Sequence, residues 1–381
     1  MVNSEYLKQT VEPLLDWFRE NARDLPWRET ADLRKKTDMT GSGSPERSYY
    51  VWISEIMLQQ TRVEAVKPYF LRFIQALPDI AALAVCPEDK LLKLWEGLGY
   101  YNRVRNMQKA AVRVLEEYDG RLPADYEALL DLPGIGSYTA GAIASIAYNI
   151  PVAAVDGNVL RVISRIVENE EDITKQSVRT GIEAAIKEII PKACPGIFNQ
   201  ALMELGAIVC LPNGMPECDR CPVSDLCLAR LHGKIEEIPK KKVKQQRRIE
   251  ERTVLVIRDG FYTVIRKRPK MGLLAGLYEL PNMEGHRSED EVLCYLKEEG
   301  LAPIRIQPLP PAKHIFSHVE WRMSGYMVLV EQMSASDNPD LMIVEPERTE
   351  AEYPIPAAFA AYVQYLQIRL GQEKYEQERK Q

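Results

Sequence analysis

The sequence predicts a multidomain protein in which an all-α N-terminal region is followed by a small α+β domain. Three observations support this division. Between about residue 11 and residue 230, helical patterns follow one another with short Gly or Pro breaks and without a strand pattern. Residues 233–252 then form a strongly basic segment. Beyond it, two apolar runs flank Asp259-Gly260, a dipeptide that strongly indicates a β-hairpin.

The length and composition are those of a globular protein. The 381 residues suffice for two or three domains with cores of their own, and 46% hydrophobic and 27% charged residues are ordinary values. The net charge of −6 does not indicate a nucleic-acid binder, although such proteins can carry positive charge locally. Residues 1–18 include three acidic side chains and lack the order of a signal peptide. We therefore expect a helix there and a cytoplasmic protein.

The first elements in chain order are a helix and a loop. Residues 11–20 are amphipathic with a helical period. The stretch from Glu29 to Ser48 is polar and basic and contains Gly-Ser-Gly-Ser-Pro at residues 41–45. This composition predicts a flexible surface loop.

Glu55 is the first candidate for a catalytic residue. It lies in the helical stretch 51–61 (VWISEIMLQQT), where no choice of helix face leaves it on a polar side. A carboxyl group in apolar surroundings has a raised pKa and is available as a general acid near neutral pH. The alternative is a structural glutamate paired with a buried arginine, for which Arg62 and Arg103 are candidates.

Residues 132–155 form an uncharged stretch of 24 residues whose length alone would admit a membrane span. Its composition predicts something else. The sequence Leu-Pro-Gly-Ile-Gly at 132–136 indicates a tight turn, Ser137 is a candidate N-cap, and residues 139–148 form a small-residue apolar helix. Asn-Ile-Pro at 149–151 ends that helix, and a loop then leads to Asp156.

A turn at the start of a helix can bind phosphate through its backbone. This stretch resembles the helix-hairpin-helix of DNA repair glycosylases. The resemblance implies that the N–H groups of Ile135 and Gly136, after Gly134, hold a DNA phosphate without reading a base. The alternative is an ordinary glycine-turned helical hairpin inside a core. The carboxylate of Asp156, at loop distance, favours the first interpretation.

Four of the seven cysteines predict a metal site. Cys210, Cys218, Cys221 and Cys227 are separated by gaps of 7, 2 and 5 residues, after an apolar helix at 199–209. Four thiolates in so short a segment suit either zinc or a four-iron, four-sulfur cluster, and the odd total suits a reducing compartment. The other three cysteines, at positions 86, 194 and 294, are expected in the core.

The C-terminal half begins with a basic segment. Residues 233–252 hold eight Lys or Arg and four Glu, a local net charge of 8 − 4 = +4. The segment is either a solvated linker or one that lies along DNA phosphates. Strands are then expected at 253–257, 261–265 and 326–330, and a helix at 289–298.

Several motifs together resemble one family. They are SEIMLQQTRVEAVKPYF (54–70), WEGLGYYNRVRN (95–106), LPGIGSYTAGAIAS (132–145), VDGNVLRV (155–162) and FNQALMELGAIVC (198–210). In this order they are similar to the adenine DNA glycosylases that remove adenine mispaired with 8-oxoguanine, within the helix-hairpin-helix/Gly-Pro-Asp superfamily. Each motif alone is weak, and the combination is specific.

The resemblance implies a division into domains. Residues 1–232 would form the all-α catalytic region, with a helical barrel at about 49–150 and a cluster domain made of the N-terminal helix and about 151–232. Residues 233–250 would be a basic linker. Residues 251–370 would form a Nudix-like lesion-recognition domain, and residues 371–381 a polar tail.

The resemblance also implies roles for four residues in base excision. Glu55 would protonate adenine at N7, and Asp156 would stabilise the oxocarbenium-like sugar cation, as carboxylates do in glycoside hydrolysis. Asn158 would orient this pair, and Tyr138 would lie beside the reacting sugar. Related pyrimidine-damage glycosylase/lyases carry a lysine at position 138, which forms a Schiff base. Tyrosine cannot, so the enzyme is expected to be monofunctional.

Further residues match the family's DNA contacts. An enzyme that acts on a base in duplex DNA must flip it out and fill the hole. Gln60 and Tyr100 resemble the family's intercalating pair, and Thr61 matches a position near the opposite strand. Ser317 and His318 belong to a loop that resembles the one reading 8-oxoguanine. Tyr101 is expected to pack in the interior.

The C-terminal domain is expected to bind rather than cut. It resembles the hydrolases that clean oxidised nucleotides, which need a glutamate-rich metal helix. If Gly300 marks the glycine of that helix, Leu293, Cys294 and Lys297 replace residues of its metal-binding pattern.

The resemblance favours an iron–sulfur cofactor. In the family a Cys-x6-Cys-x2-Cys-x5-Cys run holds a 4Fe-4S cluster; here the first gap has one residue more, which we place in the turn at Asn213-Gly214. Zinc stays the alternative. Expected partners are duplex DNA with A:8-oxoguanine or A:G mismatches, and replication or mismatch-repair proteins. We expect a monomer associated with the nucleoid of a bacterium. The competing functions are a pyrimidine-damage glycosylase/lyase and a catalytically silent DNA-damage sensor.

Overall fold

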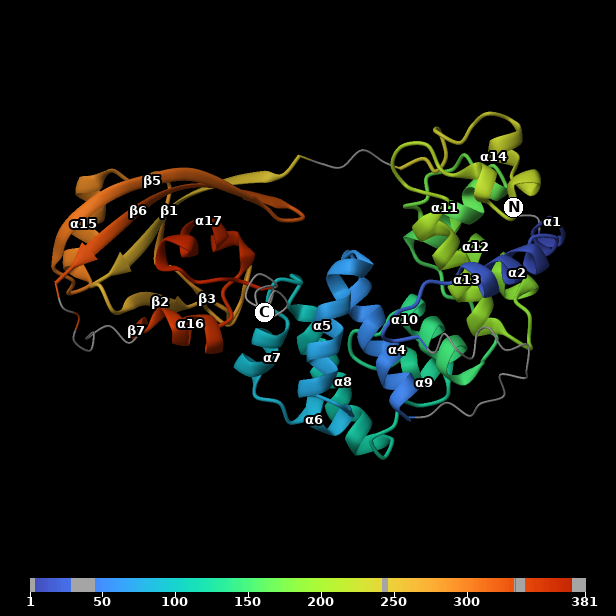
Figure 1. Ribbon diagram of the computed structural model, residues 1–381, viewed down its shortest axis with the longest axis horizontal. Coiled ribbons are helices and arrows are strands. Elements are labelled where there is room, and N and C mark those ends of the chain that lie inside the picture. Colours follow the sequence, from blue (N-terminus) through green and yellow to red (C-terminus); the bar gives the residue numbers. More distant parts are fainter. Residues whose placement is uncertain (1–3, 29–44, 242–245, 332, 334–339, 372–381) are drawn as a thin grey trace. The chain divides into compact units, whose positions relative to one another are not determined.

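The computed structural model describes residues 4–28, 45–241, 246–331, 333 and 340–371 (Figure 1). The chain divides into two compact units. The first joins Met1–Val85 to Asn106–Val243, and the second joins Cys86–Arg105 to Lys244–Gln381. The sequence had placed residues 86–105 in the N-terminal region. They fall in the second unit because the helix they contain packs on the C-terminal segment.

The described residues of the first unit are helical, as the sequence predicted. Its helices are α1 (Ser4–Lys8), α2 (Val11–Asn21), α4 (Pro45–Leu58), α5 (Val63–Ala76), α6 (Ile80–Ala84), α9 (Tyr126–Leu130), α10 (Ser137–Ala142), α11 (Gly157–Ile166), α12 (Gln176–Ile189), α13 (Pro195–Ile208) and α14 (Leu228–Leu231). A π-helix, Ile143–Ala147, continues α10, and α8 (Asn102–Glu117) starts in the second unit and runs into the first.

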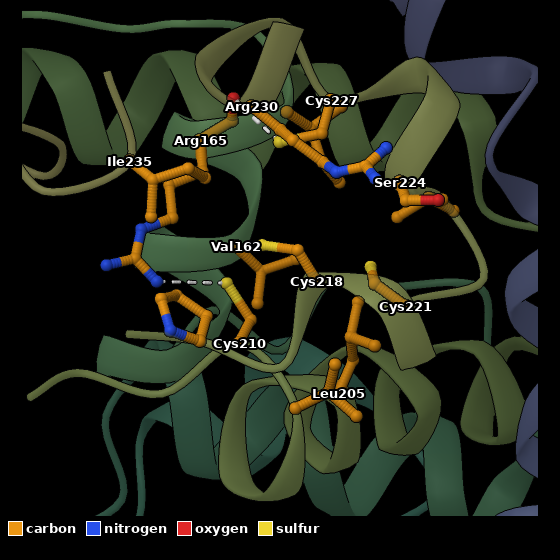
Figure 2. Close-up of a pocket in the computed structure, with 14 residues that line it drawn as sticks. Val162, Arg165, Leu205, Cys210, Cys218, Cys221, Ser224, Cys227, Arg230 and Ile235 are labelled. Atoms are coloured by element: carbon orange, nitrogen blue, oxygen red, sulfur yellow. Dashed lines mark hydrogen bonds between the residues drawn. The ribbon is translucent and has the colours of Figure 1, made fainter. Parts of the chain in front are cut away.

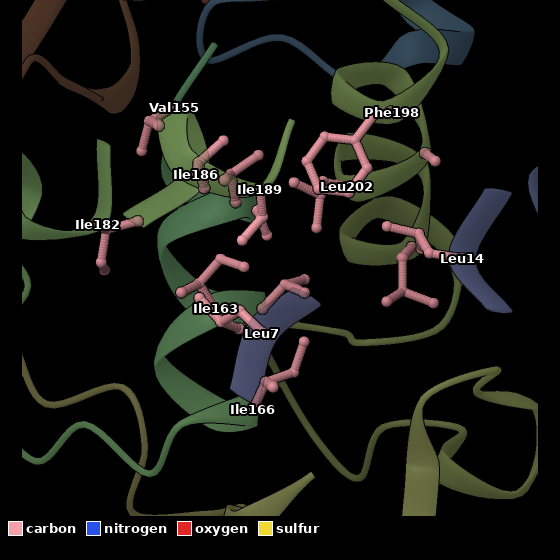
Figure 3. Packing of buried hydrophobic residues seen from close by; sticks show 14 of the residues in the cluster. Leu7, Leu14, Val155, Ile163, Ile166, Ile182, Ile186, Ile189, Phe198 and Leu202 are labelled. Atoms are coloured by element: carbon pink, nitrogen blue, oxygen red, sulfur yellow. The ribbon is translucent and has the colours of Figure 1, made fainter. Parts of the chain in front are cut away.

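One core of the first unit lies among α2, α11, α12 and α13 (Figure 3). Apolar residues recur on one face of each helix, and Phe18, Ile163, Ile186 and Phe198 meet with at most 1% of their surface exposed. Burying each such side chain contributes roughly 1.5–3 kcal/mol. This core fixes α11 and α13, which carry much of the candidate site.

The turn before α10 differs in detail from the prediction. The N-cap of α10 is Gly136, with extended backbone and no side-chain hydrogen bond, so the expectation that Ser137 caps the helix was wrong. Gly134 has φ 78, a left-handed conformation that suits glycine. A Cβ there would lie 2.7 Å from Cβ of Asn106, so a side chain would also clash.

The second unit is a mixed sheet with helices on it. Its elements are α7 (Glu88–Leu94), β1 (Arg248–Arg258), β2 (Thr263–Lys267), β3 (Tyr278–Glu279), β4 (Asn282–Glu284), α15 (Glu289–Glu298), β5 (Pro303–Ile315), β6 (Val319–Val330), β7 (Leu341–Val344), α16 (Pro346–Glu352) and α17 (Ala360–Val363). The main strand order is β3-β2-β1-β6-β5, with β4 on β1 and β7 on β2. β1 runs parallel to β6, and the other pairs are antiparallel.

Alternation along β1 builds a core on each face of the sheet. Val254 and Val256 face the helical segment 357–366, whereas Leu255 and Ile257 face α15. α15 begins with a capping box between Ser288 and Glu291, and its bounds agree with the expected helix at 289–298. The sheet therefore lies between two helical layers.

The segment expected to link the two parts is in part ordered against the first unit. Lys234 forms ion pairs with Glu168 and Glu170, both at 2.6 Å, and Lys240 pairs with Glu170 at 3.0 Å. β1 already begins at Arg248, inside the expected linker. In the described part of the segment, four basic side chains thus have carboxylate partners: Lys234, Lys240, Arg248 and Arg252. This weakens the interpretation that the whole segment lies along DNA.

Other expectations fall partly outside the described residues. Residues 29–44 of the expected loop lie outside them, and its last four residues, 45–48, begin α4 instead. Of the expected tail 371–381, only Gly371 is described. In the described ranges, none of the helices combines the length and apolar character that crossing a bilayer requires.

Candidate active site and cysteine-lined cavity

Glu55 lies inside the first unit on α4, where every residue from Val51 to Met57 is buried. Its side chain accepts a hydrogen bond from the hydroxyl of Tyr138. Burial raises the pKa of Glu55 from 4.5 to about 7; the charge of Asp156 also raises it, while the Tyr138 hydrogen bond and the charge of Arg28 lower it. The group is therefore a carboxylic acid that holds its proton near neutral pH, as the sequence predicted.

Tyr138 comes from α10 and faces the same space. Its hydroxyl also points to Sδ of Met203 at 3.7 Å. Burial, followed by the charges of Glu55 and Asp156, holds the pKa of Tyr138 well above 10. The phenol therefore keeps its proton and acts as a donor toward Glu55. Within the first unit, the alternative pairing of Glu55 with Arg62 is not the arrangement found.

Asp156 is the N-cap of α11. Oδ1 accepts the N–H of Val159 at 2.8 Å, and Oδ2 accepts Nδ2 of Asn158 at 2.8 Å. Burial raises the pKa of Asp156, and these hydrogen bonds counteract the rise by favouring the ionised form. The N-terminal end of α11 also favours a negative charge. A buried acid and a capped carboxylate thus belong to one site.

Asn158 is held by Arg161 of its own helix and packs against α13. Its Oδ1 accepts Nη2 of Arg161 at 2.9 Å, and Arg161 also donates to the carbonyls of Gly206 at 2.7 Å and Cys210 at 2.9 Å. A Cβ on Gly206 would lie 2.6 Å from Cβ of Asn158, so only glycine leaves room for this contact. The hydrogen bonds connect Asp156 with the first cysteine of the predicted metal site.

Three polar residues of the site were not predicted from the sequence: Arg28, Gln200 and Glu204. Arg28 donates to Oε1 of Gln200 at 3.0 Å and pairs with Glu204 at 3.2 Å. Glu204 is 1% exposed and is also bound by Arg23 at 2.7 Å. Burial would raise the pKa of Glu204, but the Arg23 hydrogen bond and the two arginine charges outweigh it and lower the pKa.

A signal for two of these residues was present in the sequence. Gln200 and Glu204 stand four residues apart in a stretch that, apart from Asn199, is otherwise apolar, so they share a helix face. Polar residues at this spacing in a buried helix indicate a shared polar partner. Nothing local indicated that Arg28, from the N-terminal segment, would be that partner.

Arg28 and Gln200 line a cavity of about 130 Å³. One buried water needs only roughly 10–15 Å³ by such a measure, so the space is large enough for a small organic group. Its other lining residues are Pro26, Trp27, Arg47, Tyr50, Val51 and Ile146. Val51 lies one helical turn before Glu55, so the cavity adjoins the helix that carries the acid.

The residues of the first unit that are expected to contact DNA differ in exposure and in hydrogen bonding. Gln60 is exposed and left-handed (φ 61), just after α4, and Thr61 is half-buried. Within the described chain, no hydrogen bond uses the N–H of Gly136, which stays available to an anion. The N–H of Ile135, however, donates to the carbonyl of Leu132 at 3.1 Å. The expectation that it holds a phosphate is corrected, because the turn itself uses this donor.

The second unit brings together two other predicted DNA contacts. Tyr100 is 51% exposed, whereas Tyr101 is 7% exposed and packed, as expected. Ser317 and His318 lie in the exposed turn between β5 and β6. The hydroxyl of Tyr100 and Oγ of Ser317 are 3.0 Å apart.

The four cysteines predicted as ligands surround one cavity (Figure 2). Cys210, Cys218, Cys221 and Cys227 line it together with apolar side chains from α11 and α13. Nη1 of Arg165 approaches Sγ of Cys210 at 3.3 Å. The pKa of Cys221 is raised to about 12, chiefly by burial and to a smaller extent by the neighbouring cysteines, while a hydrogen bond from the backbone of Val223 lowers it. Four thiolates in such a space therefore need a cationic centre to neutralise them.

The arrangement does not converge on a single ion. In the described residues, no three His, Cys, Asp or Glu side chains are grouped closely enough to hold one metal ion. Gly214 is left-handed (φ 73), so the longer first gap does contain a turn. Of the remaining cysteines, Cys86 is buried and Cys194 is half-buried, but Cys294 is exposed on α15. Its placement in a core was wrong, because it lies on the solvent face of that helix.

Comparison with known proteins gives two domain matches. Residues 53–188 match the family described as "HhH-GPD superfamily base excision DNA repair protein", and residues 253–365 match the family described as "NUDIX domain". A solved structure described as a thermostable thymine-DNA glycosylase is 28% identical, with a TM-score of 0.50 over 60% of this chain and 98% of that one.

Similar curated proteins share one description. "Adenine DNA glycosylase" of Mus musculus is 36% identical and aligns with 86% of this chain and 72% of its own length. The protein of that description from Homo sapiens is 32% identical, with coverage of 94% and 74%. The one from Buchnera aphidicola subsp. Baizongia pistaciae is 32% identical, with coverage of 86% and 88%.

Proposed function

The chain belongs to the adenine DNA glycosylases, base-excision-repair enzymes that hydrolyse an N-glycosidic bond, and from this premise we propose that it removes adenine mispaired with 8-oxoguanine or guanine. The observation that carries the proposal is that Glu55, a buried acid, lies within electrostatic range of Asp156, a capped carboxylate. The 130 Å³ cavity next to α4, lined in part by Arg28 and Gln200, is the proposed place for the flipped base.

The proposed reaction proceeds in two steps. Protonated Glu55 gives its proton to N7 of adenine, so the base leaves neutral as the bond to C1′ breaks. Ionised Asp156 stabilises the positive charge that develops on the sugar. The Glu55 carboxylate then takes a proton from a water that attacks C1′, which leaves an abasic site and regenerates the acid.

Two neighbours hold these groups through hydrogen bonds. The hydroxyl of Tyr138 orients Glu55 by donating to Oε2, and Asn158 donates to Asp156 at 2.8 Å, which favours the carboxylate. Tyr138 has no amine and cannot form a Schiff base with the sugar. We therefore propose a monofunctional glycosylase that leaves the strand intact.

The DNA contacts in this proposal come from several turns. The N–H of Gly136, in the turn opened by Gly134, would bind a phosphate. Gln60 and Thr61, and Tyr100 from the second unit, would enter or flank the hole left by the base. Ser317 and His318 would meet the 8-oxoguanine.

For the cysteine-lined cavity we propose a 4Fe-4S cluster. Cys210, Cys218, Cys221 and Cys227 are soft thiolate ligands around one space, and thiolates of this kind hold iron–sulfur clusters. When bound, the cluster would cross-link the loop after α13. Arg161, which donates to the carbonyl of Cys210 and to Asn158, would keep that loop in register with Asp156.

The experiment that tests the proposed function is a single-turnover incubation with duplexes that carry adenine opposite 8-oxoguanine, guanine or thymine. Each sample is divided, and half is heated with alkali. We expect strand breaks at the adenine only after alkali, and only in the first two duplexes. Breaks without alkali would indicate lyase chemistry. Tight binding without breaks in either half would favour a damage sensor.

A further inference from the structure

Within the second unit, α7 is tied to the C-terminal segment by a buried charge. Glu96, just after α7, is 3% exposed and accepts the N–H of Ile355 at 2.8 Å and that of Gly371 at 3.2 Å, one on each oxygen. Lys93, with 8% of its side chain exposed, pairs with Glu96 at 2.9 Å and donates to the carbonyl of Tyr353 at 2.9 Å. Removing one partner of such a pair leaves a buried charge uncompensated, so a substitution at either residue should weaken the attachment.

The same helix is bound to the sheet at a second point. Asp89 accepts Nζ of Lys267, from β2, at 3.0 Å and the hydroxyl of Tyr278, from β3, at 3.0 Å. Lys267 and Asp89 are both about half exposed, so this contact is weaker than the buried one. Glu96 and Lys93 therefore dominate the attachment of α7.

The turn that follows Glu96 carries Tyr100 and is held rigidly. The indole N–H of Trp95 donates to the carbonyl of Gly99 at 3.0 Å. Arg103 donates to the carbonyls of Leu98 at 3.0 Å and Gly99 at 3.2 Å, and its guanidinium lies 5.4 Å from the centre of the Tyr100 ring. We therefore infer that a displacement of Glu96 shifts Tyr100, four residues later.

Tyr100 also meets the turn between β5 and β6 directly. Its hydroxyl is 3.0 Å from Oγ of Ser317, a residue 217 positions away in the sequence. Tyr100, proposed to enter the space left by the flipped base, and Ser317, proposed to contact 8-oxoguanine, thus share a hydrogen bond. Both are anchored in one unit, Tyr100 through Glu96 and Ser317 through β5 and β6.

We propose that Glu96, together with Lys93, is a positioning residue that couples lesion recognition to base excision. It fixes the turn that carries Tyr100 within the unit that carries Ser317. Contact of Ser317 with 8-oxoguanine therefore sets the position at which Tyr100 enters the duplex. This inference rests on the proposed function and goes beyond it, because it assigns discrimination between 8-oxoguanine and guanine to a residue that need not touch DNA.

The variant that tests the coupling is Glu96→Gln. Glutamine keeps the shape of glutamate but turns one acceptor into a donor, which then faces a backbone N–H, and it removes the charge that pairs with Lys93. Glu116→Gln is the matched control, since Glu116 is exposed on α8. The measurement is the single-turnover rate constant for adenine opposite 8-oxoguanine and opposite guanine, in the full-length protein.

We expect Glu96→Gln to lower the ratio of the two rate constants about tenfold, by slowing excision opposite 8-oxoguanine and leaving excision opposite guanine within about twofold. Glu116→Gln should leave the ratio unchanged. Tyr100→Phe, which removes only the hydroxyl, should lower the same ratio. In the double variant that combines Glu96→Gln and Tyr100→Phe, the two fold-losses in the ratio should not multiply. Both substitutions interrupt the same connection between Glu96 and Ser317.

Circular dichroism and thermal unfolding show whether each variant is folded. If Glu96→Gln fails to fold, Lys93→Met tests the same pair and should lower the ratio in the same direction. An unchanged ratio, an equal fall of both rate constants, or fully multiplicative losses in the double variant would overturn the coupling. A wild-type protein that does not excise adenine would overturn the proposed function instead, so the two failures are distinguishable.

Discussion

Tyr138 and Glu55, which are 83 residues apart in the sequence, share a hydrogen bond in which the phenol donates to Oε2 of the carboxyl group. The bond joins α10 to α4 and places the residue next to the glycine-rich turn against the acid. It lowers the pKa of Glu55, but burial raises that pKa by more. The balance between these two effects determines the pH range in which the acid is protonated.

Replacing the acid should abolish excision without unfolding the protein. We expect Glu55→Gln to bind mismatched duplex DNA and to lower the single-turnover rate constant by roughly 10²–10⁴-fold, the usual contribution of a general acid. Glu46→Gln, an exposed substitution on the same helix, is the control. Excision by Glu55→Gln at the wild-type rate would show that another group is the acid.

The rate should fall as the pH rises through about 7. Glu55 must carry its proton to act, and its pKa is raised from 4.5 to about 7. Asp156 must be ionised, and its pKa is also raised, so a second loss of rate is expected on the acidic side. A pH profile of the single-turnover rate constant should therefore be bell-shaped. A rate that stays constant from neutral to alkaline pH would contradict this role of Glu55.

Stability should depend on pH for the same reason. Because the pKa of Glu55 is higher in the folded state, its protonated form favours folding below about pH 4.5, and this contribution is lost as the pH rises through about 7. Above that pH, Glu55→Gln should exceed the wild type in free energy of unfolding by roughly 3 kcal/mol, and the difference should shrink toward pH 4. Urea unfolding at several pH values measures it.

Tyr138→Phe should shift the alkaline limb of the profile. The lost hydrogen bond lowers the pKa of Glu55 in the wild type, so its removal raises that pKa and moves the loss of rate to higher pH. The maximal rate should fall, because the acid is less firmly oriented. Tyr118→Phe on the half-buried Tyr118 is the control. A shift toward lower pH would contradict the geometry of the pair.

The cysteine-lined cavity gives a prediction with an internal control. Cys221→Ser should lose iron and sulfide, lose the visible absorption of the cluster, and be less stable than the wild type. Cys294→Ser should match the wild type in all three properties, because Cys294 is exposed and far along the chain. Elemental analysis of the purified protein is the measurement. Zinc without iron in the wild type would establish the other cofactor.

Gly206 should be intolerant of substitution. In Gly206→Ala the new Cβ would lie 2.6 Å from Cβ of Asn158, so Asn158 must move and Asp156 loses its side-chain donor. We expect slower excision and a lower free energy of unfolding. Gly181→Ala, inside α12 with nothing near the new Cβ, should instead stabilise by roughly 0.5–1 kcal/mol. Equal behaviour of the two variants would show that the approach of α13 to Asn158 is not needed.

The sequence by itself determined the features that depend on residues close together in the chain. The helical region, the hairpin at Asp259-Gly260 and the helix at 289–298 follow from local periods and turn residues, and the structure has them. The cysteine group and the apolar setting of Glu55 are also local, since each lies within one or two elements. Predictions from the local sequence were wrong at two residues. At Ile135 the turn uses its own N–H donor, and Cys294 lies on the exposed face of a short helix.

Only the tertiary structure decided which distant side chains complete the site. Arg28 reaches Gln200 across 172 positions, Tyr138 reaches Glu55 across 83, and Glu96 reaches Ile355 across 259. These contacts follow from how helices pack, and packing is set by the shapes of whole faces rather than by any segment. A buried polar group must find a partner, but its own neighbourhood in the sequence does not say where that partner comes from.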